Sequence, residues 1–142
     1  MARPQSIILF ERLYLGALAL GILNTALNWS AAGAIIADEP ALAGVASWYQ
    51  PVATAIGIAI PLLLWYFIAR RGSPVAKWIM VVLSALAAAG LVWSLSVGSA
   101  NLSLIGILGI ITVLLNLAAA WTLFRPDAKP WFGEVPAADA AA

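Results

Sequence analysis

Residues 56–78 read IGIAIPLLLWYFIARRGSPVAKW and decide the fold of this chain. An apolar run is followed by the basic pair Arg70 and Arg71, a Gly-Ser-Pro turn comes next, and a second apolar run starts at Lys77 and Trp78. About 20 apolar residues span the hydrocarbon core of a bilayer, and basic residues gather on one side of it. The stretch therefore predicts two membrane helices joined by a short basic turn.

The composition also indicates a chain that lies mostly in lipid. Of the 142 residues, 64% are hydrophobic and 9% are charged, and the mean hydropathy is +1.01. An ordinary soluble domain is about 45–50% apolar and about 25% charged. A soluble fold of this length has no means of burying so much apolar surface.

Residue types that are missing exclude several functions. The chain has no Cys and no His, which excludes disulfides, thiolate chemistry, Cys/His zinc sites, iron–sulfur clusters and haem held by imidazole. A net charge of +1 without a long basic run argues against nucleic acid as a partner. Carboxylates outside the apolar segments show no spacing typical of metal ligands, among them Asp38, Glu39, Asp127 and Glu134. The sequence thus predicts no cofactor and no metal site.

Catalysis is also poorly supported by the residues present. Ser and Thr occur in the apolar segments, but no His, Lys or carboxylate at membrane depth is there to activate them as nucleophiles. No Asp, Glu, Lys or Arg lies at the centre of an apolar segment, which argues against proton-coupled transport. We therefore expect a protein that is not an enzyme.

Four apolar segments predict an all-α, polytopic membrane protein with four transmembrane helices in a bundle. The expected spans are approximately 9–30, 51–69, 77–96 and 102–124. Pro61 predicts a kink in the second span. A cleaved signal peptide is the alternative for the first segment, but its length and its two Asn favour a retained helix. The remaining residues, 125–142, form a tail too weakly patterned to fold alone and expected to be disordered at its end.

The long segment between the first two spans, residues 30–50, admits two interpretations. Asp38 before Glu-Pro is a good helix start, because an Asp oxygen can cap free backbone N–H groups and Pro suits the first turn. Leu42, Val45 and Tyr49 then share one face at helical spacing. The segment is either a short helix on the membrane surface or an early start of the second span.

The charge distribution predicts the orientation. All seven basic residues lie in the N-terminal segment, the loop after the second span, or the tail: Arg3, Arg12, Arg70, Arg71, Lys77, Arg125 and Lys129. Four spans place these three segments on one side, and the positive-inside rule makes that side cytoplasmic, with both termini inside. Arg70, Arg71 and Lys77 are expected to form a small basic patch there, attracted to anionic lipid.

Tryptophan supports the same orientation, since its amphipathic ring favours the membrane–water interface. Trp65, Trp78 and Trp121 mark the predicted cytoplasmic interface. Trp29, Trp48 and Trp93 mark the opposite one.

Few polar groups lie at membrane depth. Asn24 and Asn28 are four residues apart on the first span, and Thr112 and Asn116 are four apart on the last, so each pair shares a helix face. Such stripes of small and polar residues let helices approach closely and hydrogen-bond across the contact. Helix packing is one interpretation, and a polar pocket for a small neutral or lipid-like ligand is the other.

Glu11 lies about one turn inside the first span. We expect it to form an interfacial ion pair with Arg12, or with Arg70 and Arg71 of the neighbouring loop. A contact with a lipid head group or with a partner is the alternative.

Two interfacial segments resemble those of a known class. The segments LFRPDAKPWF (123–132) and IARRGSPVAKW (68–78) are similar to the corresponding parts of small four-helix bacterial inner-membrane proteins. The resemblance implies a bacterial inner (cytoplasmic) membrane, and it implies no catalytic residue, because most such families have no assigned activity. The opening LYLG (13–16) is similar to small multidrug-resistance transporters, but those need a carboxylate where this chain has Leu, Ala, Gly and then Asn24.

Two functional hypotheses follow. The first is a non-catalytic membrane protein that acts by helix packing, as an accessory subunit of a larger membrane complex or as a homo-oligomer. The alternative is a small facilitator or carrier, with a neutral or lipid-like ligand bound in a bundle pocket lined by Asn24, Asn28, Thr112 and Asn116. The expected partners are the lipid bilayer and either another membrane protein or a second copy of the chain.

Overall fold

A computed structural model describes residues 3–41, 44–98 and 103–134, and this part of the chain contains helices and no strand. The elements in order are α1 (Gln5–Leu27), α2 (Trp29–Asp38), α3 (Ala46–Ala69), α4 (Pro74–Ser96), α5 (Leu104–Thr122) and the short 3-10 helices η1 (Pro126–Ala128) and η2 (Pro130–Phe132). Four of them, α1, α3, α4 and α5, are long and apolar enough to cross a membrane. The all-α class with four candidate spans is confirmed.

The first helix starts earlier and is followed by more helix than the sequence predicts. α1 begins at Gln5 and ends at Leu27, and α2 follows directly after a break at Asn28. Asp38 is the last residue of α2, so the prediction that it starts a helix is wrong. The physical reason is Pro40, which disfavours helical backbone at the residue before it; Glu39 is extended, with φ −80° and ψ 113°.

The second span starts early, which is one of the two interpretations left open above. α3 begins at Ala46 and continues to Ala69 without interruption at Pro51 or Pro61. Leu42, the first member of the expected apolar face, lies outside the described residues. A kink at Pro61 stays a prediction.

Both later membrane helices begin with a serine cap. The Ser73 hydroxyl accepts a hydrogen bond from the Ala76 amide at 3.3 Å, and Pro74 occupies the first turn, where its missing N–H costs nothing. The Ser103 hydroxyl accepts from the Gly106 amide at 3.5 Å at the start of α5. These caps place the helix starts at positions 74 and 104.

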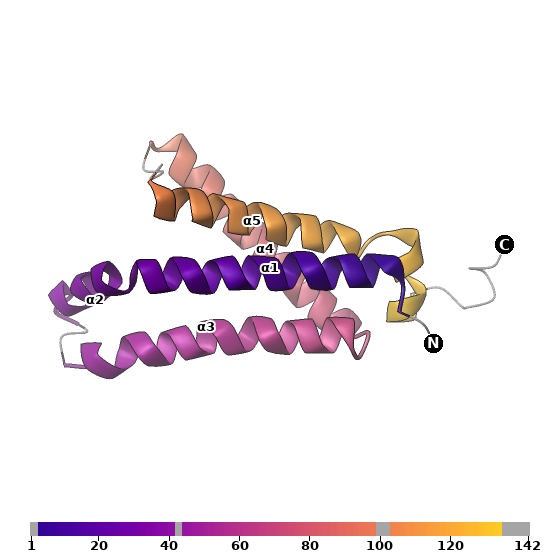
Figure 1. The fold of residues 1–142 in the computed structure, drawn as a ribbon, viewed down its shortest axis with the longest axis horizontal. Coiled ribbons are helices and arrows are strands. Elements are labelled where there is room, and N and C mark those ends of the chain that lie inside the picture. Colours follow the sequence, from indigo (N-terminus) through magenta and orange to yellow (C-terminus); the bar gives the residue numbers. More distant parts are fainter. Residues whose placement is uncertain (1–2, 42–43, 99–102, 135–142) are drawn as a thin grey trace.

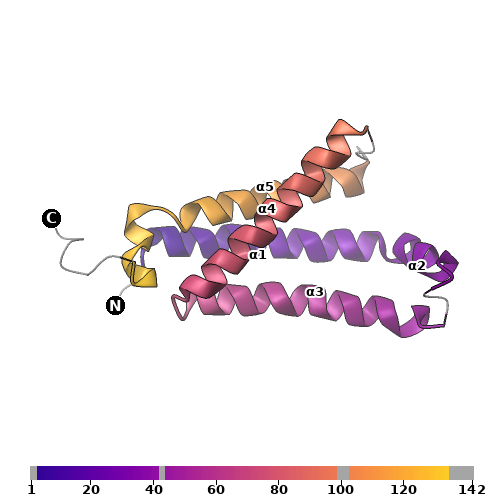
Figure 2. The same cartoon turned by 180° about the vertical axis from the view of Figure 1, so that it is seen from behind.

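Among the four long helices, α1 packs mainly against α5 and α3. Figure 1 shows α1 between α3 and α5, with α4 crossing behind them. Seen from behind in Figure 2, α4 runs diagonally, from α3 where it begins to α5 where it ends. α4 therefore leaves α3 progressively along its length.

The buried core occupies one end of this bundle. We call the end where α1 begins and α3 ends the closed end, and the end that carries α2 the open end (Figure 1). The core cluster lies at the closed end: Ile7, Phe10, Tyr14, Leu64, Ile68, Ala69, Ala76, Met80, Ala119, Ala120, Leu123, Ala128 and Phe132. In α4, the buried residues stop at Ser84, and α2 has none.

The residues after α5 fold against the closed end, up to the last described residue, Glu134. Phe132 and Ala128 belong to the core cluster. The indole N–H of Trp131 donates to the Ile68 carbonyl at 2.9 Å. We call Pro126–Glu134 the C-terminal segment. The predicted disorder at the end of the chain concerns residues 135–142, which lie outside the described part.

Candidate functional site

A cavity of about 580 Å³ lies in the open half of the bundle, bounded by α1, α2, α3 and α5. Its size falls in the range of about 300–1,000 Å³ typical of small-molecule sites. The residues singled out from the sequence all line it: Asn24, Asn28, Thr112 and Asn116. The structure thus brings together two polar pairs that are far apart in sequence.

Most of these polar side chains do not bond from one helix to another. The Thr112 hydroxyl donates to the Leu108 carbonyl at 2.8 Å, and the Asn116 amide donates to the Thr112 carbonyl at 3.0 Å, both within α5. Thr25 donates to the Gly21 carbonyl at 2.9 Å within α1. The expected hydrogen bonds across the contact of α1 with α5 are not made by these residues.

Asn24 differs from these residues, because its carbonyl oxygen Oδ1 is buried and, like Ser6 Oγ and Trp65 Nε1 at the closed end, has no hydrogen-bond partner in the described part of the chain. A buried polar atom without a partner costs about 1–3 kcal/mol. The Asn24 side chain lies beside α5 at Gly109, where an added Cβ would be 3.8 Å from the amide nitrogen. Because this oxygen is buried, a ligand in the cavity reaches it only if the Asn24 side chain rotates.

Two further polar residues of this site were not singled out from the sequence. Gln50 lines the cavity, and its amide donates to the Trp29 carbonyl at 2.8 Å, which ties α3 to the start of α2. Tyr14 lines the cavity at its other end and is 5% exposed. Gln50 could have been identified had α3 been started at Ala46, since Thr54 then follows it by one helical turn.

A second, smaller cavity of about 160 Å³ adjoins the first on the side of α4. The two share Tyr14, Pro61 and Asn116. The other lining residues of the second cavity come from α3 and the first half of α4: Leu64, Met80, Leu83, Ser84 and Ala87. The two cavities thus adjoin at Tyr14, Pro61 and Asn116, and of the two only the second is lined by α4.

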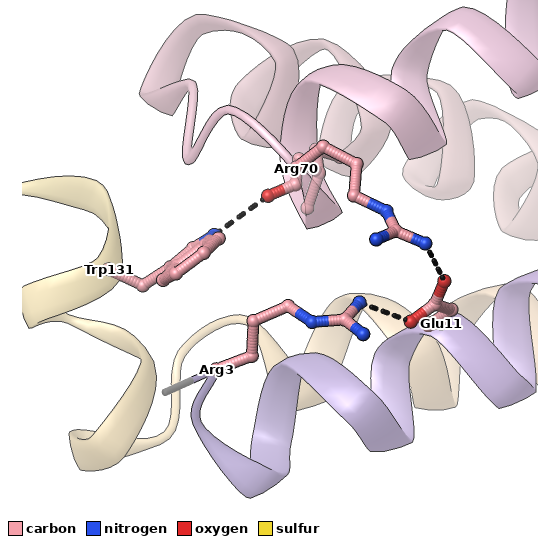
Figure 3. A network of polar contacts seen from close by, with 5 residues as sticks. Arg3, Glu11, Arg70 and Trp131 are labelled. Atoms are coloured by element: carbon pink, nitrogen blue, oxygen red, sulfur yellow. Dashed lines mark hydrogen bonds and ion pairs between the residues drawn. The ribbon is translucent and has the colours of Figure 1, made fainter. Parts of the chain in front are cut away.

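Glu11 joins two separate segments at the closed end. Its carboxylate lies 2.8 Å from an Arg3 nitrogen and 3.6 Å from an Arg70 nitrogen. Figure 3 shows Glu11 between the two guanidinium groups. The expected pairing with Arg70 is therefore present, Arg12 is not the partner, and Arg3 is an additional one.

Lys77 does not lie in the expected surface patch with Arg70 and Arg71. Its side chain is 2% exposed, and the ammonium group lies 2.6 Å from the Glu134 carboxylate. The rings of Phe124 and Phe132 surround it at 4.6 and 4.9 Å. A pairing partner 57 residues away in the C-terminal segment buries this charge, and the sequence pattern near Lys77 contains no sign of it.

Of the remaining residues predicted at this interface, Arg70, Arg71, Trp78 and Trp121 are exposed, whereas Trp65 is half-buried against the core cluster. Arg70 stacks over the Trp65 ring at 5.6 Å, and Arg71 lies 5.9 Å from the Tyr66 ring. Trp78 and Trp121 are 55% and 76% exposed, which leaves their rings free to contact surrounding lipid.

Asp127 compensates for the lack of a cap at the start of α1. Pro4 occupies the cap position and makes no side-chain cap, and the Ser6 amide instead donates to the Asp127 carboxylate at 3.0 Å. Burial by itself would raise the pKa of Asp127, but the hydrogen bonds from Ser6 and the charge of Arg125 hold that pKa below its ordinary value. The Arg71 guanidinium donates to the Tyr66 hydroxyl at 3.5 Å, and this contact raises the pKa of Arg71 above its ordinary value.

Acidic residues do not gather into a metal centre within residues 3–41, 44–98 and 103–134. Comparison of the chain with protein-family models, curated proteins and solved structures found no match. The function is therefore argued from the two cavities and the surfaces around them.

Proposed function

We propose that this multi-pass membrane protein is non-catalytic and binds a small neutral or lipid-like ligand in the cavity at its open end. One observation carries the proposal: polar side chains of α1, α3 and α5 converge on one cavity that no charged residue lines. Polar groups that serve only to hold helices together would bond to one another. A neutral ligand in the cavity lies beside the amide and hydroxyl groups of Asn28, Thr54 and Asn116.

The test is to identify what the cavity retains during purification. The wild-type protein and the double variant Asn24→Leu/Asn116→Leu would be purified in mild detergent, and the bound small molecules and lipids would be measured by native mass spectrometry. We expect a ligand at near-stoichiometric amounts in the wild type and its loss in the double variant. A wild-type protein without any bound ligand would contradict the proposal.

A matched pair of substitutions controls for general damage to α5. Thr112 and Thr122 lie on the same helix, and each hydroxyl donates to a carbonyl of that helix, at 2.8 and 2.7 Å. Only Thr112 lines a cavity. Thr112→Val is expected to weaken ligand retention, whereas Thr122→Val should leave it unchanged.

A second candidate function is helix packing with another protein, as an accessory subunit or as a homo-oligomer. The far half of α4 favours it, because Leu86, Val92 and Trp93 are 64%, 65% and 70% exposed and an added Cβ at Gly90 meets nothing within 4 Å. Oligomeric mass in native detergent tests it. Gly90→Trp should disrupt any oligomer formed through this face, and a monomer without co-purifying protein would contradict this candidate.

We further propose that the closed end faces the cytoplasm and that the membrane is a bacterial inner membrane. The proposal is supported by Arg3, Arg70 and Arg125, which lie at the closed end, and by Asp38 and Glu39, which lie at the open end (Figure 1). Because the chain has no Cys, single cysteines report orientation cleanly. Glu39→Cys should react with an impermeant maleimide in intact cells, and Lys129→Cys only after permeabilisation. The reverse pattern would refute the orientation.

A further inference from the structure

We infer that the two adjoining cavities form one site for an uncharged amphiphile, with a hydroxyl-bearing head group at the open end and an acyl chain between α3 and α4. The inference rests on the proposed function and specifies the chemistry of its ligand. It depends on the polarity of the two linings, on the absence of charge in them, and on their combined length.

Polarity falls from the first cavity to the second. Amides and hydroxyls line the open-end part of the first: Asn24, Thr25, Asn28, Gln50 and Thr54. The second shares Tyr14, Pro61 and Asn116 with the first and is otherwise lined by Leu64, Met80, Leu83, Ser84 and Ala87. Its additional hydroxyl, on Ser84, lies 4.0 Å from the Met80 sulfur and turns toward that side chain. This gradient matches a molecule that is polar at one end and apolar at the other.

Charge complementarity restricts the head group. Neither lining contains an Asp, Glu, Lys or Arg. A phosphate or carboxylate placed there would be an unpaired charge away from water, which is far more costly than a hydrogen-bonded neutral group. The amide and hydroxyl groups of Asn28, Gln50 and Thr54 line the open-end part of the first cavity. A hydroxyl group is neutral and can both donate to and accept from such groups.

The length of the site fits a lipid. Gln50 and Leu64 lie at the two ends of the lining along α3, and 14 helical residues rise about 21 Å. One leaflet is about half of the roughly 30 Å hydrocarbon core, or about 15 Å. The site is therefore long enough for a head group and one acyl chain that extends toward the middle of the membrane.

The test uses a photoactivatable diacylglycerol that carries a diazirine in its acyl chain, incorporated into phosphatidylcholine nanodiscs with the full-length protein. Crosslinked peptides are located by mass spectrometry. The comparison probe is phosphatidic acid with the same labelled chain, which differs only in its charged head group. We expect crosslinks at residues 80–87 with diacylglycerol, and at least a tenfold lower yield there with phosphatidic acid.

Two matched variants test where the acyl chain of the ligand lies. Ala87 lines the second cavity and Ala89, on the same helix, does not. Ala87→Trp should reduce the diacylglycerol crosslink at 80–87 at least tenfold, and Ala89→Trp should leave it within twofold of wild type. Asn24→Leu should also reduce this crosslink, by about tenfold, because it removes a polar group from the part of the cavity that holds the head group. Thermal melts of each variant confirm that it is folded.

The outcomes separate this inference from the proposed function. Equal labelling by both probes, or labelling that Ala87→Trp does not change, would overturn the inference that the ligand is an uncharged amphiphile. If the purified protein nevertheless retains a ligand that Asn24→Leu/Asn116→Leu removes, the proposed function stands and only the inference fails. If no ligand is retained and no site is labelled, both fail.

Discussion

The two ends of the bundle are built on different principles. At the closed end, buried apolar residues of all four long helices meet, and the C-terminal segment adds polar contacts to α1, α3 and α4 through Asp127, Trp131 and Glu134. At the open end, α2 has no buried residue, and the first cavity lies among α1, α2, α3 and α5. Buried polar atoms without a partner occur at both ends, Ser6 Oγ and Trp65 Nε1 at the closed end and Asn24 Oδ1 in the open half. The two ends therefore differ in packing, with the core cluster at one and the cavity at the other.

Gly72 provides the strongest way to break the closed end. Its φ of +59° disfavours any residue with a Cβ, and a Cβ there would overlap the Trp131 carbonyl oxygen. Left-handed backbone alone costs about 1–2 kcal/mol, and displacement of the C-terminal segment adds to it. We expect Gly72→Ala to lower the free energy of unfolding in mild detergent by about 3 kcal/mol or more.

Gly98, at the open end, is the matched control for Gly72. It has φ +67°, and an added Cβ meets nothing within 4 Å. Gly98→Ala should cost only the backbone term, about 1–2 kcal/mol. Equal losses for the two variants would show that the contact of Gly72 with Trp131 contributes nothing to stability.

Glu134→Gln should have the next largest effect. It leaves the Lys77 ammonium, which is 2% exposed, without its carboxylate. Removal of one partner of a buried pair costs about 3–5 kcal/mol; because the Glu134 side chain is 33% exposed, we expect about 2 kcal/mol here. Tryptophan fluorescence during urea or thermal unfolding in detergent measures the loss.

The double variant Lys77→Met/Glu134→Gln sharpens that result. It removes the charge together with its partner, and Met keeps an apolar chain against Phe124 and Phe132. Replacement of a buried pair by apolar groups is often neutral, so the double variant should be more stable than Glu134→Gln alone. If it is less stable, Lys77 stabilises the closed end without Glu134, through its contacts with Phe124 and Phe132.

Trp131→Phe tests a single hydrogen bond of the same segment. The indole donates to the Ile68 carbonyl near the end of α3, one of the carbonyls that a helix terminus leaves without an internal partner. Its loss should cost about 1 kcal/mol. Trp121→Phe is the control, because that side chain is 76% exposed and should change stability by less than about 0.5 kcal/mol.

The difference between the ends also explains what the sequence could predict. Hydropathy identifies the four long helices because each is stabilised along its own length, and spacing of four residues correctly placed Asn24 with Asn28 and Thr112 with Asn116 on shared faces. Lys77 was misplaced on the surface because its partner, Glu134, is brought to it only by the folded C-terminal segment. Such contacts depend on tertiary packing, and no local period encodes them.

The open end should respond in the opposite direction to polar-to-apolar substitution. In ligand-free protein, Asn24→Leu removes a buried acceptor that has no partner, so we expect unchanged stability or a gain of up to about 1 kcal/mol. Unfolding of protein washed free of lipid measures this, since a bound ligand would stabilise the wild type and mask the gain. A loss above about 1 kcal/mol would favour the helix-packing role of Asn24.

Acid should loosen the closed end slightly, through Asp127. Burial by itself would raise the pKa of the Asp127 carboxyl. The hydrogen bonding from Ser6 and the charge of Arg125 lower it, so that the folded-state pKa lies below the ordinary value of 3.8. A lowered pKa means that the contribution is complete above about pH 4 and is lost as the pH falls through the folded-state pKa. Because the side chain is exposed, solvent screening limits the contribution to a few tenths of a kcal/mol. Comparison of wild type with Asp127→Asn between pH 7 and pH 3 should show the difference in stability shrinking toward acid. A difference that stays constant would mean that the capping of α1 does not depend on the charge of Asp127.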